Sequence, residues 1–424
     1  MKRKFVFIIL SVSVLFLCLS CPSYLIWENL EDYKSLDDLS YITEKTEIKT
    51  FSHLNEPIVI TMPVWETRYY KGRKKGKTRK FKFGDIFVVI DVEKNEVFDW
   101  VYFGGETGTT LYRPLELGSP VKYYASCYYT GNIVCLDPDK SELTVIESSF
   151  KNCHFINFNI NSKYGVKAQR IRKEDNSVFY DFEILDGQEN RILSYKPEIL
   201  FHNDDYIFHV LEDKDGNIYF NNYLFTNNGE VPDRNYLVRI NLKNEIFETF
   251  DLNLLIEKDN NICSYNEHYV SENQLFITQF NDNDSIGESL LIFKKNNAGY
   301  ELEKEIKTDF KTFDNLIVKI TEINGTVYII VRNWSDKYAY VDIYKLTDEL
   351  EMEKITPDWY GSTIPENEKF KINFTDNIWV RGNRIYFMNS KDTSKVAYRF
   401  YDVKSGKYST QPVWIDFNDV VNLK

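Results

Sequence analysis

The stretch Ile378-Trp379-Val380-Arg381-Gly382-Asn383-Arg384-Ile385-Tyr386-Phe387 reads as two short apolar strands joined by a tight turn. Glycine and asparagine tolerate positive φ angles, so the Gly382-Asn383 pair suits a two-residue hairpin turn. The arrangement recurs where Asp215-Gly216-Asn217 precedes Ile218-Tyr219-Phe220, and where Asn324-Gly325 precedes Val327-Tyr328-Ile329. A hairpin that returns along the chain predicts a repeat fold made of β-strands.

Weaker copies of the second strand begin at Ile86, Ile133, Val178 and Leu275. Together with the three clear copies they form seven anchors, spaced 40–58 residues apart. Four-stranded propeller blades run about 40–50 residues each, and loops can absorb the longer intervals. Two of the intervals divide into four strand-like segments each. The segments are 206–211, 218–220, 237–242 and 246–250, and then 316–320, 327–331, 341–346 and 352–355.

This pattern predicts an all-β fold, a β-propeller of about seven four-stranded blades, with six or eight as alternatives. A long β-sandwich or two stacked β domains is the competing architecture. We expect the propeller to occupy residues 51–424 as one domain, preceded by an N-terminal signal and a tether. A hydrophobic content of 43% is enough for a core, and the 16% of aromatic residues suits packed strands.

The chain carries a formal net charge of −12, and the first twenty residues contribute three basic residues and no acid. The remainder is therefore still more acidic. A strongly acidic body argues against nonspecific binding to nucleic acid or to anionic lipid, so we expect no nucleic-acid partner.

The N-terminus begins with the basic run Lys2-Arg3-Lys4, followed by a mostly apolar stretch from Phe5 to Leu19. That stretch of 15 residues is shorter than the 20 or so of a typical membrane span. It ends at Cys18-Leu19-Ser20-Cys21, which resembles the lipobox of bacterial lipoproteins. The usual branched residue three places before the modified cysteine is replaced by Cys18, and such relaxed boxes resemble those of spirochaete-type lipoproteins.

The resemblance implies a signal peptide at residues 1–20, a palmitate-type lipid on Cys21, and attachment to a membrane of the bacterial cell envelope. We expect the outer membrane, in either leaflet. An uncleaved N-terminal anchor or an ordinary signal peptide cut nearby is the alternative. Residues 21–50 would then be the tether. Apolar residues at every third place predict either a short amphipathic helix or an acidic spacer there.

One segment concentrates positive charge on an otherwise acidic protein. The eight basic residues between positions 71 and 82 are Lys71, Arg73, Lys74, Lys75, Lys77, Arg79, Lys80 and Lys82. Gly72 and Gly76 indicate a loop between the strands Trp65–Tyr70 and Phe81–Phe83. The segment is then either a solvated hairpin tip or an anion-binding loop for lipid head groups, an acidic glycan or an acidic protein patch.

No familiar catalytic or metal motif is present. The five histidines form neither His-x-x-x-His nor His-Glu-x-x-His, and there is no Gly-x-Ser-x-Gly elbow. The segment Asp213–Asn217 begins like a calcium loop, but Ile218 and Leu224 occupy the positions that need glycine and a bidentate acid. We expect no cofactor, no metal and no catalytic residue. An enzyme acting through paired acids that meet only in space is the less favoured reading.

Cys127 and Cys135 flank the Gly131-Asn132 pair, where we expect another hairpin turn. A two-residue loop would place Tyr128 opposite Cys135, with the two sulfur atoms on opposite faces. A three-residue loop would make the two cysteines direct partners. Both registers, and the disulfide state of these residues and of Cys153 and Cys263, stay open at this point.

Taken together, these features favour a membrane-anchored binding module that contacts a protein or glycan through one face of the propeller. The first alternative is a periplasmic scaffold that assists envelope assembly. The second is a hydrolase or lyase acting on polysaccharide.

Overall fold

The computed structural model describes most of the strands of the chain and part of its turns. The lipobox with Cys21 and most of the expected tether lie outside the described residues. The described residues are 33–35, 40–70, 78–104, 114–153, 155, 163–172, 174, 178–196, 206–212, 217–224, 234–241, 246–251, 263–281, 289–296, 299–308, 310, 315–334, 339–356, 378–392, 395–409 and 413–416.

The chain divides into two compact units. The first consists of Met1–Tyr41 and Trp65–Phe83; in it β1 (Tyr33–Ser35) pairs antiparallel with the end of β2 (Ile58–Tyr70), Tyr33 lying opposite Tyr70. The second consists of Ile42–Val64 and Gly84–Lys424. The short helix α2 (Ser40–Thr43) lies where the two units join in sequence. No helix in the described ranges is long and apolar enough to cross a membrane.

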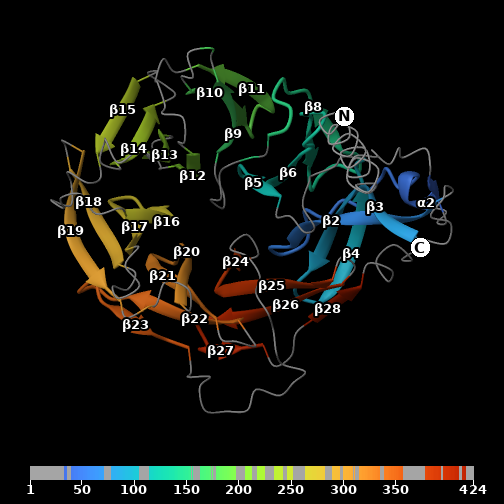
Figure 1. Ribbon diagram of the computed structural model, residues 1–424. Coiled ribbons are helices and arrows are strands. Elements are labelled where there is room, and N and C mark those ends of the chain that lie inside the picture. The colour runs from blue at the N-terminus through green and yellow to red at the C-terminus, as the bar shows by residue number, and fades with distance from the viewer. Residues whose placement is uncertain are drawn as a thin grey trace, which may run out of the picture. The chain divides into compact units, whose positions relative to one another are not determined.

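Strands that follow one another in the chain also lie next to one another, so each sheet is an antiparallel meander (Figure 1). The first sheet holds β1 and β2 with β3 (Thr78–Asp91) and β4 (Glu96–Tyr102), and it contributes residues to both units. Six further sheets lie wholly in the second unit. The first two of these sheets are β5 (Leu115–Leu117), β6 (Lys122–Ser126), β7 (Ile133–Leu136) and β8 (Thr144–Ile146), and then β9 (Tyr164–Arg172), β10 (Val178–Asp186) and β11 (Arg191–Tyr195). The next two are β12 (Tyr206–Glu212), β13 (Asn217–Leu224), β14 (Arg234–Asn241) and β15 (Ile246–Asp251), and then β16 (Cys263–Val270), β17 (Gln274–Asn281), β18 (Ser289–Asn296) and β19 (Gly299–Lys307). The last two are β20 (Asn315–Ile323), β21 (Thr326–Trp334), β22 (Ala339–Leu346) and β23 (Met352–Lys354), and then β24 (Ile378–Arg381), β25 (Arg384–Asp392), β26 (Lys395–Asp402) and β27 (Lys407–Tyr408), with β28 (Val413–Asp416) paired to β26.

Successive sheets of the second unit contact one another through the first described strand of each. Contacts of this kind join β5 to β9, β9 to β12, β12 to β16 and β16 to β20. First strands that meet in chain order are the hallmark of blades arranged about a common axis. The fold is therefore an all-β β-propeller, and its second unit contains six blades of mostly four strands. Six was the alternative to the expected seven.

The sequence repeat is confirmed in its main feature, because the seven anchors fall in seven different sheets, one in each. The two tight turns that the structure describes are two-residue hairpins as predicted: Arg381 pairs with Arg384, and Ile323 pairs with Thr326. Asn324, Gly325 and Gly382 all have positive φ, which explains the choice of residues there. The strand segments expected at 206–250 and 316–355 are present as β12–β15 and β20–β23.

A second repeat, which the sequence analysis missed, lies in the hairpin that leads into the last strand of a sheet. Asp91, Asp186 and Asp402 each end a strand and accept hydrogen bonds from the backbone N–H groups two and three residues later. The residue four places on has positive φ in all three turns (Asn95, Asn190 and Gly406). Asp-x-x-x-Asn/Gly is thus the sequence signature of this turn.

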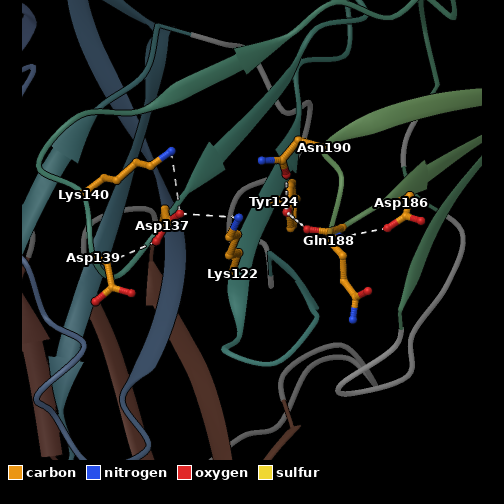
Figure 2. A network of polar contacts seen from close by, with 9 residues as sticks. Lys122, Tyr124, Asp137, Asp139, Lys140, Asp186, Gln188 and Asn190 are labelled. Atoms are coloured by element: carbon orange, nitrogen blue, oxygen red, sulfur yellow. Dashed lines mark hydrogen bonds and ion pairs between the residues drawn. The ribbon is translucent and has the colours of Figure 1, made fainter.

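Figure 2 shows Asp186 together with another acidic turn residue, Asp137, which lies on a neighbouring sheet. Asp137, which follows β7, accepts from the backbone of Asp139 and forms ion pairs with Lys122 and Lys140. In the next sheet, Asp186 holds the turn whose Gly187 carbonyl oxygen lies 2.9 Å from the Tyr124 hydroxyl. The turn at Asp186 therefore also contacts the adjacent sheet through Tyr124.

The core consists of layers between adjacent sheets. Residues of β2, β3 and β4 pack against β6 and β7, and residues of β6 and β7 pack on their other face against Leu185 of β10. Further along, β17 and β18 pack on β20 and β21, whose other residues pack on β24, β25 and β26. Ile42 and Ile48, which the sequence analysis placed in the tether, are buried, and Ile48 belongs to the first of these layers.

The cysteine register differs from both alternatives. Cys135 lies opposite Tyr124, so the β6–β7 connection runs from Cys127 to Asn132 and is longer than two or three residues. Cys127 packs in the layer toward β3, and Cys135 in the layer toward β10, so the hairpin separates the two thiols. Cys127, Cys135 and Cys153 are reduced.

Candidate functional site

A cavity of about 300 Å³ opens in the second unit, where parts of three sheets meet. Its floor is formed by buried residues of neighbouring strands, among them Glu116 on β5 and Tyr123 on β6. The segment that leads into β2 and the end of β24 supply the other walls. The lining residues are Phe51, Ser52, Leu54, Glu56, Pro57, Glu116, Pro120, Val121, Tyr123, Pro138, Val380 and Arg381.

A buried ion pair crosses the cavity from one sheet to another. Arg381, at the end of β24, binds both carboxylate oxygens of Glu116 on β5, with 3.2 Å between Nη1 and Oε2 and a closer contact between Nη2 and Oε1. The two side chains are only 9% and 1% exposed. Burial opposes the charge on Arg381, but Glu116, Tyr123 and Glu56 together outweigh it and raise the pKa of the guanidinium. The pair therefore stays ionised, and each charge is neutralised by the other.

Arg381 also fixes the edges of the cavity through its remaining donors. Its Nε–H donates to the carbonyl oxygen of Pro57 at 3.0 Å, and Nη1 donates to the carbonyl oxygen of Val380 at 2.9 Å. A guanidinium has five N–H donors, so one N–H on Nη2 remains without an acceptor within the described residues. Because Arg381 lines the cavity, a ligand oxygen can accept from this donor.

Three further polar groups line the cavity without a hydrogen-bond partner in the described part of the chain. They are the Tyr123 hydroxyl, the exposed Glu56 carboxylate and the exposed Ser52 hydroxyl. Burial raises the pKa of Tyr123, and the Glu116 charge adds to this while Arg381 opposes it, so the phenol keeps its proton at neutral pH. The cavity thus offers two hydroxyls, one carboxylate and one guanidinium N–H to a bound molecule.

The remaining wall is apolar and stiff. Phe51 and Tyr123 pack with their ring centroids 6.0 Å apart, and Phe51 is fully buried. Pro57, Pro120 and Pro138 line the cavity, and the peptide bond before Pro120 is cis. Proline and buried aromatic side chains have little rotamer freedom, so the cavity loses little entropy when a ligand binds.

A second polar cluster lies between β9 and the segment after β8. The Lys167 ammonium, fully buried, donates to the carbonyl oxygens of Gly131 and Phe150 at 2.9 Å each and to Ser148 Oγ at 3.0 Å. Glu183 in turn accepts from the Ser148 hydroxyl and from the Ser149 backbone N–H. A lysine that donates all three protons cannot act as a base toward Ser148, so this cluster joins two sheets structurally.

The structure describes the backbone of three of the site residues proposed from sequence alone. The strands expected on either side of the basic segment are present as β2 and β3, and Arg79, Lys80 and Lys82 lie in β3. The lipidation residue Cys21 and the basic residues Lys71, Arg73, Lys74, Lys75 and Lys77 lie outside the described residues. No cluster of three or more His, Cys, Asp or Glu side chains suited to a metal occurs in the described ranges.

Sequence reasoning missed the cavity because its residues come from distant places in the chain. Glu116 and Arg381 are 265 positions apart, and neither belongs to a motif. The only local signal was Arg381 itself, which stands beside the Gly382-Asn383 turn in the clearest copy of the repeat. A charged residue at the end of an apolar inner strand needs a partner when it is buried, and here that partner is Glu116.

Comparison with known proteins gives only remote structural similarities. No protein-family model matches the chain, and no curated protein matches it by sequence. Among solved structures it is similar to a puromycin-hydrolyzing peptidase of Mycobacterium tuberculosis, with 7% identity, a TM-score of 0.47 and coverage of 89% of this chain and 55% of that one. A periplasmic gluconolactonase of Pseudomonas aeruginosa has 9% identity, a TM-score of 0.44 and coverage of 84% and 96%. The WD40 domain of SCAP from fission yeast has 10% identity, a TM-score of 0.33 and coverage of 92% and 91%.

The chain spans only about half of the peptidase, and the identities are too low to carry any activity across. The fold and the cavity together define a class of protein, a β-propeller with a small, partly polar cavity where blades meet.

Proposed function

We propose that this protein is a lipid-anchored binding module of the bacterial cell envelope, and that the cavity beside Arg381 and Glu116 holds a group of a protein or glycan partner. The observation that carries this proposal is the set of polar groups with open hydrogen-bonding capacity around a preformed, stiff cavity. A volume of about 300 Å³ is at the lower end of the range for small-molecule sites, which suits one residue of a longer partner.

Binding is favoured over catalysis by the state of the acids that line the cavity. A hydrolase working on glycosidic bonds needs two carboxyl groups with different tasks, one of them protonated. Glu116 is already bound at both oxygens by Arg381, and Glu56 is exposed at the rim. This arrangement orients a ligand but provides no proton donor of the required kind.

A cavity-filling variant tests the proposal. Val121 lines the cavity and is half-buried, so Val121→Trp should occupy the cavity with little change elsewhere. Val145 on β8 is 58% exposed and does not line the cavity, so Val145→Trp is the matched control. The full-length protein in detergent is screened against envelope and host proteins and a glycan array. We expect binding that Val121→Trp abolishes and Val145→Trp preserves. Binding unaffected by both substitutions would overturn the proposal.

The anchor is proposed on the resemblance of Cys18-Leu19-Ser20-Cys21 to a lipobox. Labelled palmitate should enter the wild-type protein and not a Cys21→Ala variant. Labelling that persists in the variant would contradict lipidation at this residue. Proteinase treatment of intact and permeabilised cells then determines on which side of the membrane the propeller lies. Cleavage on intact cells supports a surface-exposed binding role, and protection until permeabilisation supports the envelope-assembly role.

The basic segment is proposed as an auxiliary contact for anionic groups such as lipid head groups. Its support is the concentration of eight basic residues on an acidic protein. Replacing them by glutamine should weaken binding of the full-length protein to vesicles that contain anionic lipid and leave cavity-dependent binding unchanged. Unchanged vesicle binding would contradict a contact between the basic segment and anionic lipid.

We also propose that the first sheet completes the propeller as a seventh blade. Residues of this sheet within the second unit contact both neighbouring blades, since Val59, Phe87 and Val101 pack with β6 and β7. On the other side, the Tyr398 hydroxyl of β26 lies 3.1 Å from the side-chain oxygen of Asn95. An experimental structure with this sheet apart from the ring would contradict the seven-blade count.

A further inference from the structure

We infer that the group held in the cavity is a single uncharged sugar ring of a glycan. This inference rests on the proposed function, because it names the chemical class of the ligand for the same cavity. Charge, hydrogen-bonding pattern and shape each point to this class.

The charge balance of the cavity disfavours an anionic ligand. Glu116 and Arg381 neutralise each other, and Glu56 at the rim adds one negative charge. A carboxylate or phosphate that entered would have to approach Glu56, and the one cation among the described lining residues, Arg381, is already paired. A cationic ligand would meet only one exposed and hydrated carboxylate. An uncharged ligand is not repelled by Glu56 and does not depend on that single hydrated carboxylate for charge neutralisation.

The hydrogen-bonding groups suit hydroxyls better than amides. The Arg381 N–H can only donate, Glu56 can only accept, and the hydroxyls of Tyr123 and Ser52 can do either. A sugar hydroxyl is both donor and acceptor, so neighbouring hydroxyls on one ring can bind Arg381 and Glu56 at once. The glycine beside Arg381 allows the Glu56 carboxylate to lie close to this donor, since a Cβ atom at Gly382 would be 3.0 Å from that carboxylate.

The apolar part of the cavity suits the C–H face of such a ring. Phe51, Leu54, Val121 and the prolines form a surface that offers no hydrogen bonds from side chains. A pyranose ring has one face of C–H groups and an edge of hydroxyls. A cavity with an apolar wall and several polar lining groups suits this division.

The test compares three kinds of probe on the full-length protein in detergent: neutral oligosaccharides of glucose, galactose, mannose and N-acetylglucosamine; the same oligosaccharides carrying sialic acid or sulfate; and proline-rich peptides. We expect binding of one or more neutral oligosaccharides that is insensitive to salt between low and physiological ionic strength. Glu56→Gln should weaken it about tenfold or more, and Tyr123→Phe about two- to tenfold, because each removes one hydrogen-bonding function.

The outcomes separate this inference from the proposed function. Binding of a charged glycan or a peptide that Val121→Trp abolishes would overturn the sugar assignment and leave the binding role intact. Stronger binding of sialylated or sulfated probes by Glu56→Gln would equally overturn it. Binding of any probe that Val121→Trp does not change would contradict the cavity as a site, and both proposals would fall together. Circular dichroism of each variant confirms that the fold is retained.

Discussion

The substitution Arg381→Met removes one partner of the buried ion pair while replacing the aliphatic part of the side chain with an apolar chain of similar length. Glu116 is 1% exposed, so its carboxylate would stay buried without the cation that neutralises it. Breaking a buried pair in this way costs about 3–5 kcal/mol of unfolding free energy. The carbonyl oxygens of Pro57 and Val380 also lose a donor, but the adjoining cavity admits water that can replace it. We therefore expect a loss of about 3–5 kcal/mol.

Urea denaturation followed by intrinsic fluorescence measures this loss as a lower midpoint at unchanged slope. Arg191→Met is the control, because Arg191 and Glu189 form an ion pair with side chains 59% and 54% exposed. An exposed pair contributes at most about 1 kcal/mol. The double variant Arg381→Met with Glu116→Leu should recover much of the loss, since no buried charge remains. A loss below about 1 kcal/mol for Arg381→Met alone would refute the buried pair as a joint between the sheets.

Three more predictions follow from single turns and thiols. Gly131 and Gly325 have φ of 81° and 80°, but a Cβ atom would lie 2.7 Å from the Phe150 carbonyl oxygen at the first and meet nothing within 4 Å at the second. Gly131→Ala should therefore lower the thermal midpoint clearly more than Gly325→Ala, and equal effects would contradict the close approach. Asp402 has a pKa held below 3.8, since backbone N–H donors outweigh the effect of burial; its contribution to stability is present above pH 3.8 and is lost as the pH falls through the lower folded value. In Asp402→Asn, unfolding experiments between pH 5 and pH 2 (roughly, the span around the carboxyl pKa) should show a shallower acid dependence than in the wild type, and an unchanged dependence would contradict this assignment. Burial raises the pKa of the Cys135 thiol to about 11, whereas Cys153 is only half-buried, so iodoacetamide should label Cys153 before Cys135 in the native protein, as peptide mass mapping will show.

The sequence predicted the fold well because short-range sequence patterns determine the strands and turns of this fold. Two-residue turns need residues that tolerate positive φ, and Gly382 and Asn324 are such residues. Alternating strands of β-branched and aromatic residues follow them in each sheet. The Asp-x-x-x-Asn/Gly turn before the last strand was equally local, as at Asp186 and Asn190, and could have been found by the same method.

The cavity could not be predicted, because it depends on which distant strands become neighbours. Nothing near Glu116 indicates that it will be buried, and nothing near Arg381 indicates its partner. The second unit contains six blades instead of the expected seven for a related reason. The seven anchors correctly marked seven sheets, but the first sheet is divided between the two units by a long hairpin that the anchors do not reveal. The cysteine register at Cys135 was missed because the connection from Cys127 is stabilised by Lys167 of another sheet, which binds the Gly131 carbonyl oxygen.

The most direct test of the central claim, that the cavity is the binding site, is hydrogen–deuterium exchange of the full-length protein with and without the neutral oligosaccharide that binds it best. The account predicts slower exchange in peptides covering residues 51–57, 116–123 and 380–381, which line the cavity. It predicts no change in peptides covering residues 71–82. Protection confined to the basic segment, with none around the cavity, would contradict the account.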